Sequence, residues 1–370
     1  MQNIEKSYFP ALTGVRALAA YMVFIHHFIP FQWESRDFNL GYFFGEFHVG
    51  VTFFFVLSGF LIHNRYSDYR ELNFSTYGKY FISRVSRIMP IFCILSTICF
   101  IYNFYFHRQD AGLFLKNFGL WILNISLLKG FFSGLHFSGI PQSWSLTVEF
   151  CFYGIAPFLF TKVKNVLLYP RVSAILLFFG FILVFIFSKL PLHGFLGDNR
   201  FMLSYSFFGR SFEFFMGCYL SFQFKKWSVE KEKNGIYTFL SLFVILFLIY
   251  ILSIFRRGDI YGVHTFPGLI VNNFFLPIAI IIFFRGLIFE NTFISRAFSS
   301  SLGQLLGKSS YAFYLIHVGF IEVGLHKFVS SNAAILFLLI NIISIGIYLY
   351  IEEPLNDIVK KKLLRILNKP

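Results

Sequence analysis

Long apolar segments recur along the whole chain and leave few folds open to it. We count ten, each near the roughly 20 residues that a helix needs to cross a bilayer: 11–31, 46–64, 88–106, 142–161, 170–189, 206–224, 236–255, 266–285, 305–325 and 332–351. No regular alternation of strands and turns accompanies them, so helices must satisfy the backbone hydrogen bonds in lipid. The sequence therefore predicts an all-α fold, a polytopic membrane helix bundle with about ten transmembrane helices.

The composition supports the same class of protein. The 370 residues are 56% hydrophobic and 14% charged, whereas soluble domains are roughly 45–50% apolar and about 25% charged. No linker separates the apolar segments, so we expect a single transmembrane domain over residues 1–370, with a short basic tail at about 355–370. The stretch 112–132 is also apolar, but its glycines favour a loop or a re-entrant piece.

Basic residues orient the predicted spans. The chain has 32 lysines and arginines against 18 acidic residues, a formal net charge of +14. With the N-terminus inside, most of the basic residues fall in cytoplasmic segments, as the positive-inside rule requires. We therefore predict an integral plasma (inner) membrane protein with both termini cytoplasmic. The first segment carries Arg16 and lacks a small-residue cleavage site, so we expect it to be retained.

Other partners and cofactors have little support. The charge distribution explains the net charge without nucleic acid, and we expect no nucleic-acid partner. We also predict no metal and no prosthetic group, since the cysteines lie in apolar segments without metal-ligand spacing and suit core thiols. They are Cys93, Cys99, Cys151 and Cys218.

Two ionisable residues share one face of the first predicted span. Arg16 and His27 stand eleven residues apart, almost three helical turns and roughly 16 Å along the axis. His26 points about 80° away from them. A histidine that faces the bundle can accept a proton near neutral pH, as a general base must. The alternative is a structural histidine bonded across helices, but its alignment with a buried arginine favours function.

Further charged residues are predicted in the outer half of the bundle. Glu149 lies on the fourth span, which begins near Trp144, and Tyr153 follows one turn later. Arg210 and Glu213 are i,i+3 partners on the sixth span. Such a pair serves substrate binding or simply neutralises itself. His317 on the ninth span suits packing as well as chemistry.

A second group is predicted at the cytoplasmic mouth. Arg84 and Arg87 lie i,i+3 at an expected helix start, where arginine forks and the helix dipole together favour phosphate. The plainer interpretation is the positive-inside signal itself. Arg16, Ser58 and Glu352 are expected at the same depth.

A series of motifs in chain order resembles the acyltransferase 3 family, over about residues 12–355. The opening Arg, ten residues and His correspond to Arg16 and His27, and the second-helix pattern to 53–62. The remaining matches are Arg-x-x-Arg-Ile-x-Pro at 84–90, Trp-Ser-Leu-x-x-Glu at 144–149, Arg-x-x-Glu-Phe at 210–214, and the closing motifs at 310–317 and 352–354. The family often has an arginine just before the third motif, where this chain has Ser83.

The resemblance implies an O-acyltransferase that moves an acyl group, usually acetyl, from cytoplasmic acyl-coenzyme A to an extracytoplasmic or lipid-linked sugar. His27 would be the general base, or a transient acyl carrier, and Glu149 its orienting partner or a sugar ligand. Coenzyme A phosphates would contact Arg84, Arg87 and Arg16, with Ser58 at the same inner mouth. The acceptor chamber would be lined by Arg210, Glu213, Trp144 and Tyr153.

The resemblance leaves the acceptor open among O-antigen, capsule, exopolysaccharide and other surface glycans. Acetyl-coenzyme A is the expected donor, membrane lipids surround the protein, and the oligomeric state is not predicted. We expect no fused extracytoplasmic esterase-like domain. The competing hypothesis is a transporter or flippase of a lipid-linked sugar or small polar solute, which intramembrane charges also suit.

Overall fold

The computed structural model confirms the all-α fold. It describes residues 8–29, 39–68, 72–106, 111–163, 165–190, 192–226, 232, 234–256 and 260–368. Among these residues helices predominate, and extended pairing is limited to two isolated bridges. The chain forms two compact units: unit 1 is Met1–Tyr69, Phe160–Ile175 and Ser211–Ser310, and unit 2 is Arg70–Leu159, Leu176–Arg210 and Tyr311–Pro370. The prediction of one domain over the whole chain stays a prediction.

Eight stretches of the described chain are long and apolar enough to cross a membrane. They are Pro10–Phe28, Leu40–Tyr66, Phe74–Tyr105, Pro141–Lys162, Leu168–Phe187, Ile236–Phe255, Phe266–Phe289 and Ala333–Leu367. Each overlaps one predicted span, so the membrane character is supported while the count of about ten is not confirmed.

The two remaining predicted spans differ for local reasons. The segment 206–224 forms α9 (Phe207–Phe224), a helix of 18 residues that carries Arg210 and Glu213. The segment 305–325 is interrupted: α14 (Ser301–Ile316) ends before Gly319, whose φ of 115° suits glycine, and α15 (Phe320–Phe328) follows. Neither α14, with 16 residues, nor α15, with 9 residues, alone reaches the length of a typical span.

The stretch predicted as a loop or re-entrant piece contains a regular helix. α5 spans Ala111–Ile125 and is followed by a 3₁₀ turn, η2, at Leu128–Phe131. The loop interpretation is therefore wrong for residues 111–125. At 15 residues, or roughly 22 Å at 1.5 Å per residue, α5 is shorter than the hydrocarbon core.

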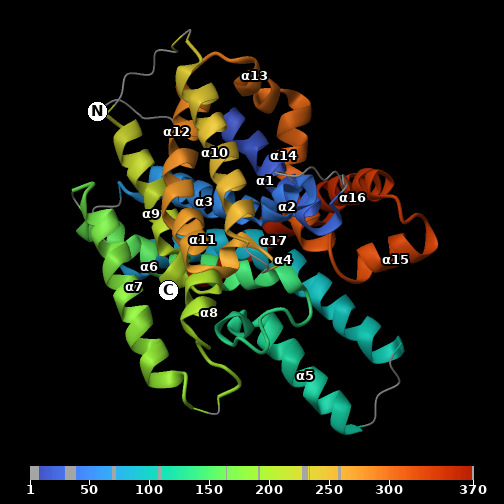
Figure 1. The fold of residues 1–370 in the computed structure, drawn as a ribbon. Helices are drawn as coiled ribbons and strands as arrows, with labels where there is room; N and C mark the ends of the chain where they lie inside the picture. The colour runs from blue at the N-terminus through green and yellow to red at the C-terminus, as the bar shows by residue number, and fades with distance from the viewer. Residues whose placement is uncertain are drawn as a thin grey trace. The chain divides into compact units, whose positions relative to one another are not determined.

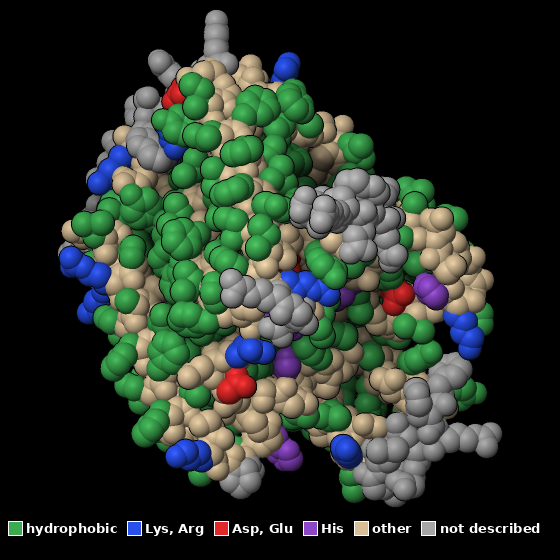
Figure 2. Space-filling model, viewed as in Figure 1, with side chains coloured by type: hydrophobic (Ala, Val, Ile, Leu, Met, Phe, Trp, Pro, Cys, Tyr) green, Lys and Arg blue, Asp and Glu red, His purple; other side chains and the backbone are tan. Residues whose placement is uncertain are grey.

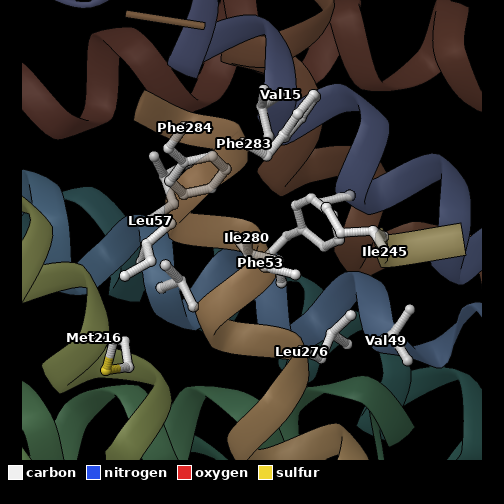
Figure 3. Packing of buried hydrophobic residues seen from close by; sticks show 14 of the residues in the cluster. Val15, Val49, Phe53, Leu57, Met216, Ile245, Leu276, Ile280, Phe283 and Phe284 are labelled. Carbon is white, nitrogen blue, oxygen red and sulfur yellow. The ribbon is translucent and has the colours of Figure 1, made fainter. Parts of the chain in front are cut away.

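Unit 1 is built around one hydrophobic core. Its helices are α1 (Pro10–Phe28), α2 (Leu40–Gly45), α3 (Gly50–Tyr66), the first part of α7 (Leu168–Phe187), most of α9, α10 (Ile236–Phe255), α11 (Phe266–Ile270), α12 (Leu276–Phe289), α13 (Phe293–Ser299) and most of α14. α10 and α12 lie side by side (Figure 1). Figure 3 shows Phe53 and Leu57 of α3 beside Ile280 and Phe284 of α12, in the cluster that also takes in α1 and α10.

Two glycines allow α3 and α9 to pack backbone to backbone within unit 1. A methyl group on Gly59 would lie 1.9 Å from the carbonyl oxygen of Phe214, and one on Gly217 would lie 2.0 Å from that of Val56. Small residues at facing positions are what lets membrane helices approach this closely. The register of α3 against α9 is thereby set, and it places Thr52 of α3 near Glu213 of α9.

Unit 2 contains α4 (Phe74–Phe106), α5, most of α6 (Trp144–Lys162), the second part of α7 (Leu168–Phe187), α8 (Asn199–Tyr205), α15, α16 (Ala333–Ile347) and α17 (Glu353–Leu367). α17 packs along α4, and α5 also packs against α4 (Figure 1). The segment 126–143 between α5 and α6 is compact and carries a buried lysine, Lys129.

Large apolar side chains remain exposed on the outside of several helices. α10 is the clearest case, since only 28% of its most apolar stretch is buried. Figure 2 shows hydrophobic side chains gathered over the region of α10. The exposed residues there include Phe239, Leu240, Phe243, Leu246, Phe247 and Ile254. A soluble protein does not expose a patch of this kind, whereas lipid covers it without cost.

Candidate functional site

α1 carries both residues of the opening motif. Pro10 occupies the first turn, where its missing N–H is not needed, and the helix continues unbroken to Phe28. Arg16 and His27 therefore lie on one helix, as predicted, eleven residues apart. The side chain of His27 is exposed, and that of Arg16 is half-buried. His27 is thus open to a reaction partner.

His26 serves a different purpose from its neighbour. Its side chain is buried, and its Nδ1 hydrogen-bonds with the carbonyl oxygen of Gly45. The ring lies 4.7 Å from the ring of His27 and 5.4 Å from that of His48, centroid to centroid. His26 therefore anchors α1 to the segment before α3 and brings His27 and His48 into one group.

A carboxylate and a histidine that the motifs do not include complete this group. Glu46 is fully buried, accepts a hydrogen bond from the backbone N–H of Gly262 at 2.7 Å, and lies 3.1 Å from Nε2 of His48. His48 is close enough to His27 to interact with it electrostatically. We call His26, His27, His48 and Glu46 the histidine cluster. Two ionisable residues at the start of the predicted span 46–64 were the signal that sequence reasoning missed.

Tyr261 closes one side of the histidine cluster. Its ring lies 4.7 Å from that of His26 and 5.9 Å from that of His48. Burial raises the pKa of the Tyr261 phenol above its ordinary value, although the nearby Arg256 works in the opposite direction. The phenol therefore stays neutral at physiological pH and packs against the imidazoles without adding charge.

Glu213 belongs to a second polar cluster inside unit 1. Its Oε1 accepts a hydrogen bond from the hydroxyl of Thr52 at 3.0 Å, and both side chains are fully buried. Thr52 also lies 3.5 Å from Oδ1 of Asn272, whose amide donates to Asn273 at 2.7 Å. The two asparagines occupy a π-helical turn, Val271–Phe275, and such turns are frequent at functional sites. Polar residues within the span 266–285 were the available signal.

Unit 2 brings together the other predicted substrate residues. The hydroxyl of Tyr153 donates to Oε1 of Glu149, one turn away on α6, as the spacing predicted. Trp144 at the start of α6 packs edge-on against Tyr205, with ring centroids 4.9 Å apart. The guanidinium of Arg210 lies 6.0 Å from the Trp144 ring and donates to the carbonyl oxygen of Ser204. These two groups within unit 2 thus offer a carboxylate in the first, and a cation with aromatic surface in the second.

The predicted phosphate arginines are not at a helix start. α4 begins at Phe74, ten residues before Arg84, so both Arg84 and Arg87 lie well inside the helix. Because the dipole acts within the first turn only, its predicted contribution to phosphate binding is wrong. Both side chains are half-buried, and their spacing on one helix face is as predicted. Ser58 is half-buried on α3, in unit 1.

His317 is engaged in local packing at the end of α14. It is fully buried, and its Nδ1 lies 2.8 Å from the carbonyl oxygen of Tyr314. The amide of Gln142 donates to the carbonyls of Tyr314, Leu315 and Val318, which satisfies the free carbonyls at this helix end. Of the two alternatives for His317, these contacts favour packing.

The predicted residues therefore fall into separate groups. His27, Arg16, Ser58 and Glu213 belong to unit 1, whereas Glu149, Tyr153, Trp144, Arg210, Arg84 and Arg87 belong to unit 2. The pairing of His27 with Glu149 stays a prediction. Among the described residues, no group of three or more histidine, cysteine and acidic side chains is arranged to hold a metal ion.

The family model called acyltransferase 3, described as an acyltransferase domain, matches residues 9–367. This chain belongs to that family. The match includes the opening motif on α1, the arginines of α4 and Glu149 of α6, and it confirms the family predicted from the motifs.

Named relatives carry O-acetyltransferase descriptions. The chain is 27% identical over 329 residues to peptidoglycan O-acetyltransferase OatA of Listeria monocytogenes, covering 85% of this chain and 49% of that protein. It is 26% identical over 325 residues to the putative peptidoglycan O-acetyltransferase YrhL of Bacillus subtilis, covering 84% and 48%. A putative O-acetyltransferase of Staphylococcus aureus is 23% identical over 338 residues, covering 85% and 51%.

The chain thus spans about half the length of the curated relatives it matches. No solved structure matches it significantly.

Proposed function

We propose that this membrane protein is an O-acetyltransferase in which His27 is the general base. The observation that carries the proposal is the histidine cluster. In it an exposed imidazole, part of the opening motif of an acyltransferase family, lies near a half-buried histidine that is paired with a buried carboxylate. A base that must take a proton from a substrate has to be accessible, and its partners have to hold it in place. His27 meets the first condition, and its ring contact with His26, which also packs against His48, is proposed to meet the second.

The proposed reaction forms one ester and breaks one thioester. A hydroxyl oxygen of the sugar attacks the thioester carbonyl carbon of acetyl-coenzyme A while His27 takes the hydroxyl proton. The tetrahedral intermediate collapses, the C–S bond breaks, and the coenzyme A thiolate leaves and takes up a proton. The products are the acetylated sugar and the free thiol. Glu46 and His48 are proposed to position the rings next to His27 rather than to touch the substrate.

The donor is proposed to enter from the cytoplasm, with both termini on that side. Arg84 and Arg87 lie one turn apart on α4 and suit the phosphates of coenzyme A, since guanidinium groups pair bidentately with phosphate oxygens. Arg16 and Ser58 are proposed at the same mouth. Glu149, Tyr153, Trp144 and Arg210 are proposed to contact the acceptor, because aromatic and charged groups suit a sugar.

Peptidoglycan is the acceptor that the relatives favour. Two of the three relatives described above are named for peptidoglycan, and none for O-antigen or exopolysaccharide. We therefore place peptidoglycan sugars ahead of the other surface glycans, with the acetyl group carried to a hydroxyl on the outer side of the membrane.

The test is transfer of labelled acetyl from acetyl-coenzyme A to peptidoglycan fragments by the purified, lipid-reconstituted protein. General acid–base catalysis contributes about 10²–10⁴-fold, so His27→Ala should lower kcat by at least 100-fold. His326 provides the control. It is exposed on α15 and belongs neither to the histidine cluster nor to the predicted site residues, so His326→Ala should retain full transfer. Undiminished transfer by His27→Ala would refute the proposed base. Movement of sugar across the membrane without labelled product would favour the transporter instead.

Glu46→Gln tests the histidine–carboxylate pair separately. The amide keeps the volume and an acceptor for Gly262 but removes the charge that holds His48. We expect kcat to fall about 10-fold, as for a positioning group, and the pH profile of kcat to shift, while KM for both substrates stays unchanged. A purely structural carboxylate would leave the pH profile unmoved.

A further inference from the structure

A cavity of about 300 Å³ lies between α4 and α5 in unit 2. Each helix presents one face to it: Ser96, Cys99, Phe100 and Asn103 from α4, and Asn117, Leu120, Trp121 and Asn124 from α5. On both helices these residues follow the i, i+3, i+4, i+7 spacing of a contact face. Small or apolar residues at such positions let membrane helices pack closely, and asparagines there commonly hydrogen-bond to the facing helix. Here three are asparagines, and the faces enclose a space.

Polar atoms at the base of the cavity lack partners in the described protein. The side chains of Ser96 and Asn124 are 5% and 4% exposed, hence more than nine-tenths buried. Within the described part of the chain, neither the Ser96 hydroxyl nor Oδ1 of Asn124 has a hydrogen-bond partner. The amide nitrogen of Asn124 is occupied, since it donates to Leu120 and Ser138. A buried acceptor left unsatisfied is costly, and a ligand that donates and accepts hydrogen bonds would remove that cost.

The wall opposite the helices is held by a buried lysine. Nζ of Lys129 donates to the backbone carbonyls of Ser138 and Ile140, on either side of Gly139. Gly139 has a φ of 67°, and a methyl group there would lie 2.6 Å from Oδ1 of Asn124. Glycine therefore keeps this acceptor uncovered. The lysine contributes structure to the wall and is not itself among the side chains that line the cavity.

The lining chemistry selects a neutral ligand with an apolar face. None of the ten lining residues is charged, and the ammonium group of Lys129 behind the wall is engaged by two backbone carbonyls, so the lining suits a neutral ligand better than a phosphate or a carboxylate. Amide and hydroxyl groups recognise hydroxyl or acetamido groups, while the rings of Phe100 and Trp121, 5.7 Å apart, offer aromatic surface. Small-molecule sites occupy about 300–1,000 Å³, and the lower end of that range suits one sugar ring.

We propose that this cavity, between α4 and α5, binds one neutral N-acetylated sugar ring of the glycan acceptor. The identification of the sugar as part of an acceptor rests on the proposed function. Asn124 and Ser96 would hold the acetamido or hydroxyl groups at the base, Asn103 and Asn117 would contact the ring nearer the opening, and Trp121 would pack against its apolar face. With both termini cytoplasmic, the end of α4 that carries Asn103 is the outer end.

The first test is direct binding to the full chain in lipid nanodiscs, with N-acetylglucosamine as the probe and saturation-transfer difference NMR as the readout. Wild-type protein should transfer saturation to the acetamido methyl group. Asn124→Leu, which removes the amide at similar volume, should abolish the signal. Asn341→Leu is the matched control, because Asn341 is also a buried asparagine that donates to the carbonyl four residues earlier, at 2.8 Å against 2.9 Å for Asn124.

Signal that survives in Asn124→Leu would overturn the proposal, as would equal loss in both variants. Saturation of lipid acyl chains in place of the sugar, dependent on Asn124, would also overturn it and assign the cavity to lipid.

The second test separates this inference from the proposed function. In the acetyl-transfer assay, Asn124→Leu should raise KM for the glycan at least 10-fold and leave kcat unchanged. Transfer with unaltered KM would refute the sugar site while the proposed function stands. Sugar binding that depends on Asn124, in a protein that transfers no acetyl group, would refute the proposed function while the sugar site stands.

Discussion

Replacing Lys129 with methionine should change how the stability of this protein depends on pH. Lys129 is fully buried, and its ammonium group donates to the carbonyls of Ser138 and Ile140 rather than to an acid. Burial lowers the pKa of Lys129 from 10.5 to about 7. The folded state therefore releases this proton at a lower pH than the unfolded state does.

The direction of the effect follows from that difference. Below pH 7 both states are protonated, and the folded state bears the full cost of the buried charge. Between pH 7 and 10.5 the unfolded state holds a proton that the folded state has released, so the free energy of unfolding rises with pH. One pKa unit corresponds to about 1.4 kcal/mol. Because the folded-state lysine is still half protonated at pH 7, the gain between pH 7 and pH 9 is smaller than two full units and amounts to about 2 kcal/mol.

Unfolding of the detergent-solubilised protein, measured at pH values from 6 to 9, tests this reasoning. The wild type should gain stability relative to Lys129→Met as the pH rises, although the variant loses the two hydrogen bonds at every pH. Lys189→Met, at an exposed lysine, should follow the wild type. Parallel stability curves for the wild type and Lys129→Met would show that the ammonium is solvated in the folded state, and would refute the argument.

Two further predictions concern packing and the donor site. Gly59→Ala should destabilise the protein by about 3 kcal/mol, the upper end of typical overpacking, because the added methyl group would lie 1.9 Å from the carbonyl oxygen of Phe214. The control Gly154→Ala, where the added methyl group would have nothing within 4 Å, should be neutral or slightly stabilising. Equal unfolding temperatures for the two variants would contradict the close contact at Gly59. Under the proposed function, Arg84→Lys and Arg87→Lys should each raise KM for acetyl-coenzyme A about 10-fold and leave kcat unchanged, because lysine cannot bind phosphate bidentately. An unchanged KM in steady-state assays would show that these arginines do not bind the donor.

Much of the site could be anticipated because its motifs are local. Arg16 and His27 are related by the geometry of one helix, and so are Glu149 and Tyr153. In each case the spacing along the sequence was enough to predict a shared face, and α1 and α6 have that geometry. The error at Arg84 was one of boundary: the polar stretch before the apolar segment continues as the first turns of α4, so the arginines are inside a helix of 33 residues.

The histidine cluster and the cavity could not be anticipated in the same way. The side chain of Glu46 is held by a hydrogen bond from Gly262, 216 residues away. That of Thr52 is held by a hydrogen bond to Glu213, 161 residues away. The spacing of residues along the sequence says nothing about such pairs. A cavity is harder still, because Asn117 and Asn124 taken alone resemble ordinary interhelical hydrogen-bonding residues.

The sequence by itself determined that this is a membrane protein and which family it belongs to. A bilayer requires long apolar helices whose backbone groups are hydrogen-bonded within the helix, and runs of apolar residues that meet this requirement are visible directly in the sequence. Only the tertiary structure decided which polar side chains meet. Burial makes a charge or an amide depend on its nearest partners, and those partners come from helices that the chain order does not place together. Thus the apolar segments predicted a lipid environment. The polar cluster around Glu213 came from the packing of α3, α9 and the segment before α12 in unit 1, and the cavity came from the packing of α4 and α5 in unit 2.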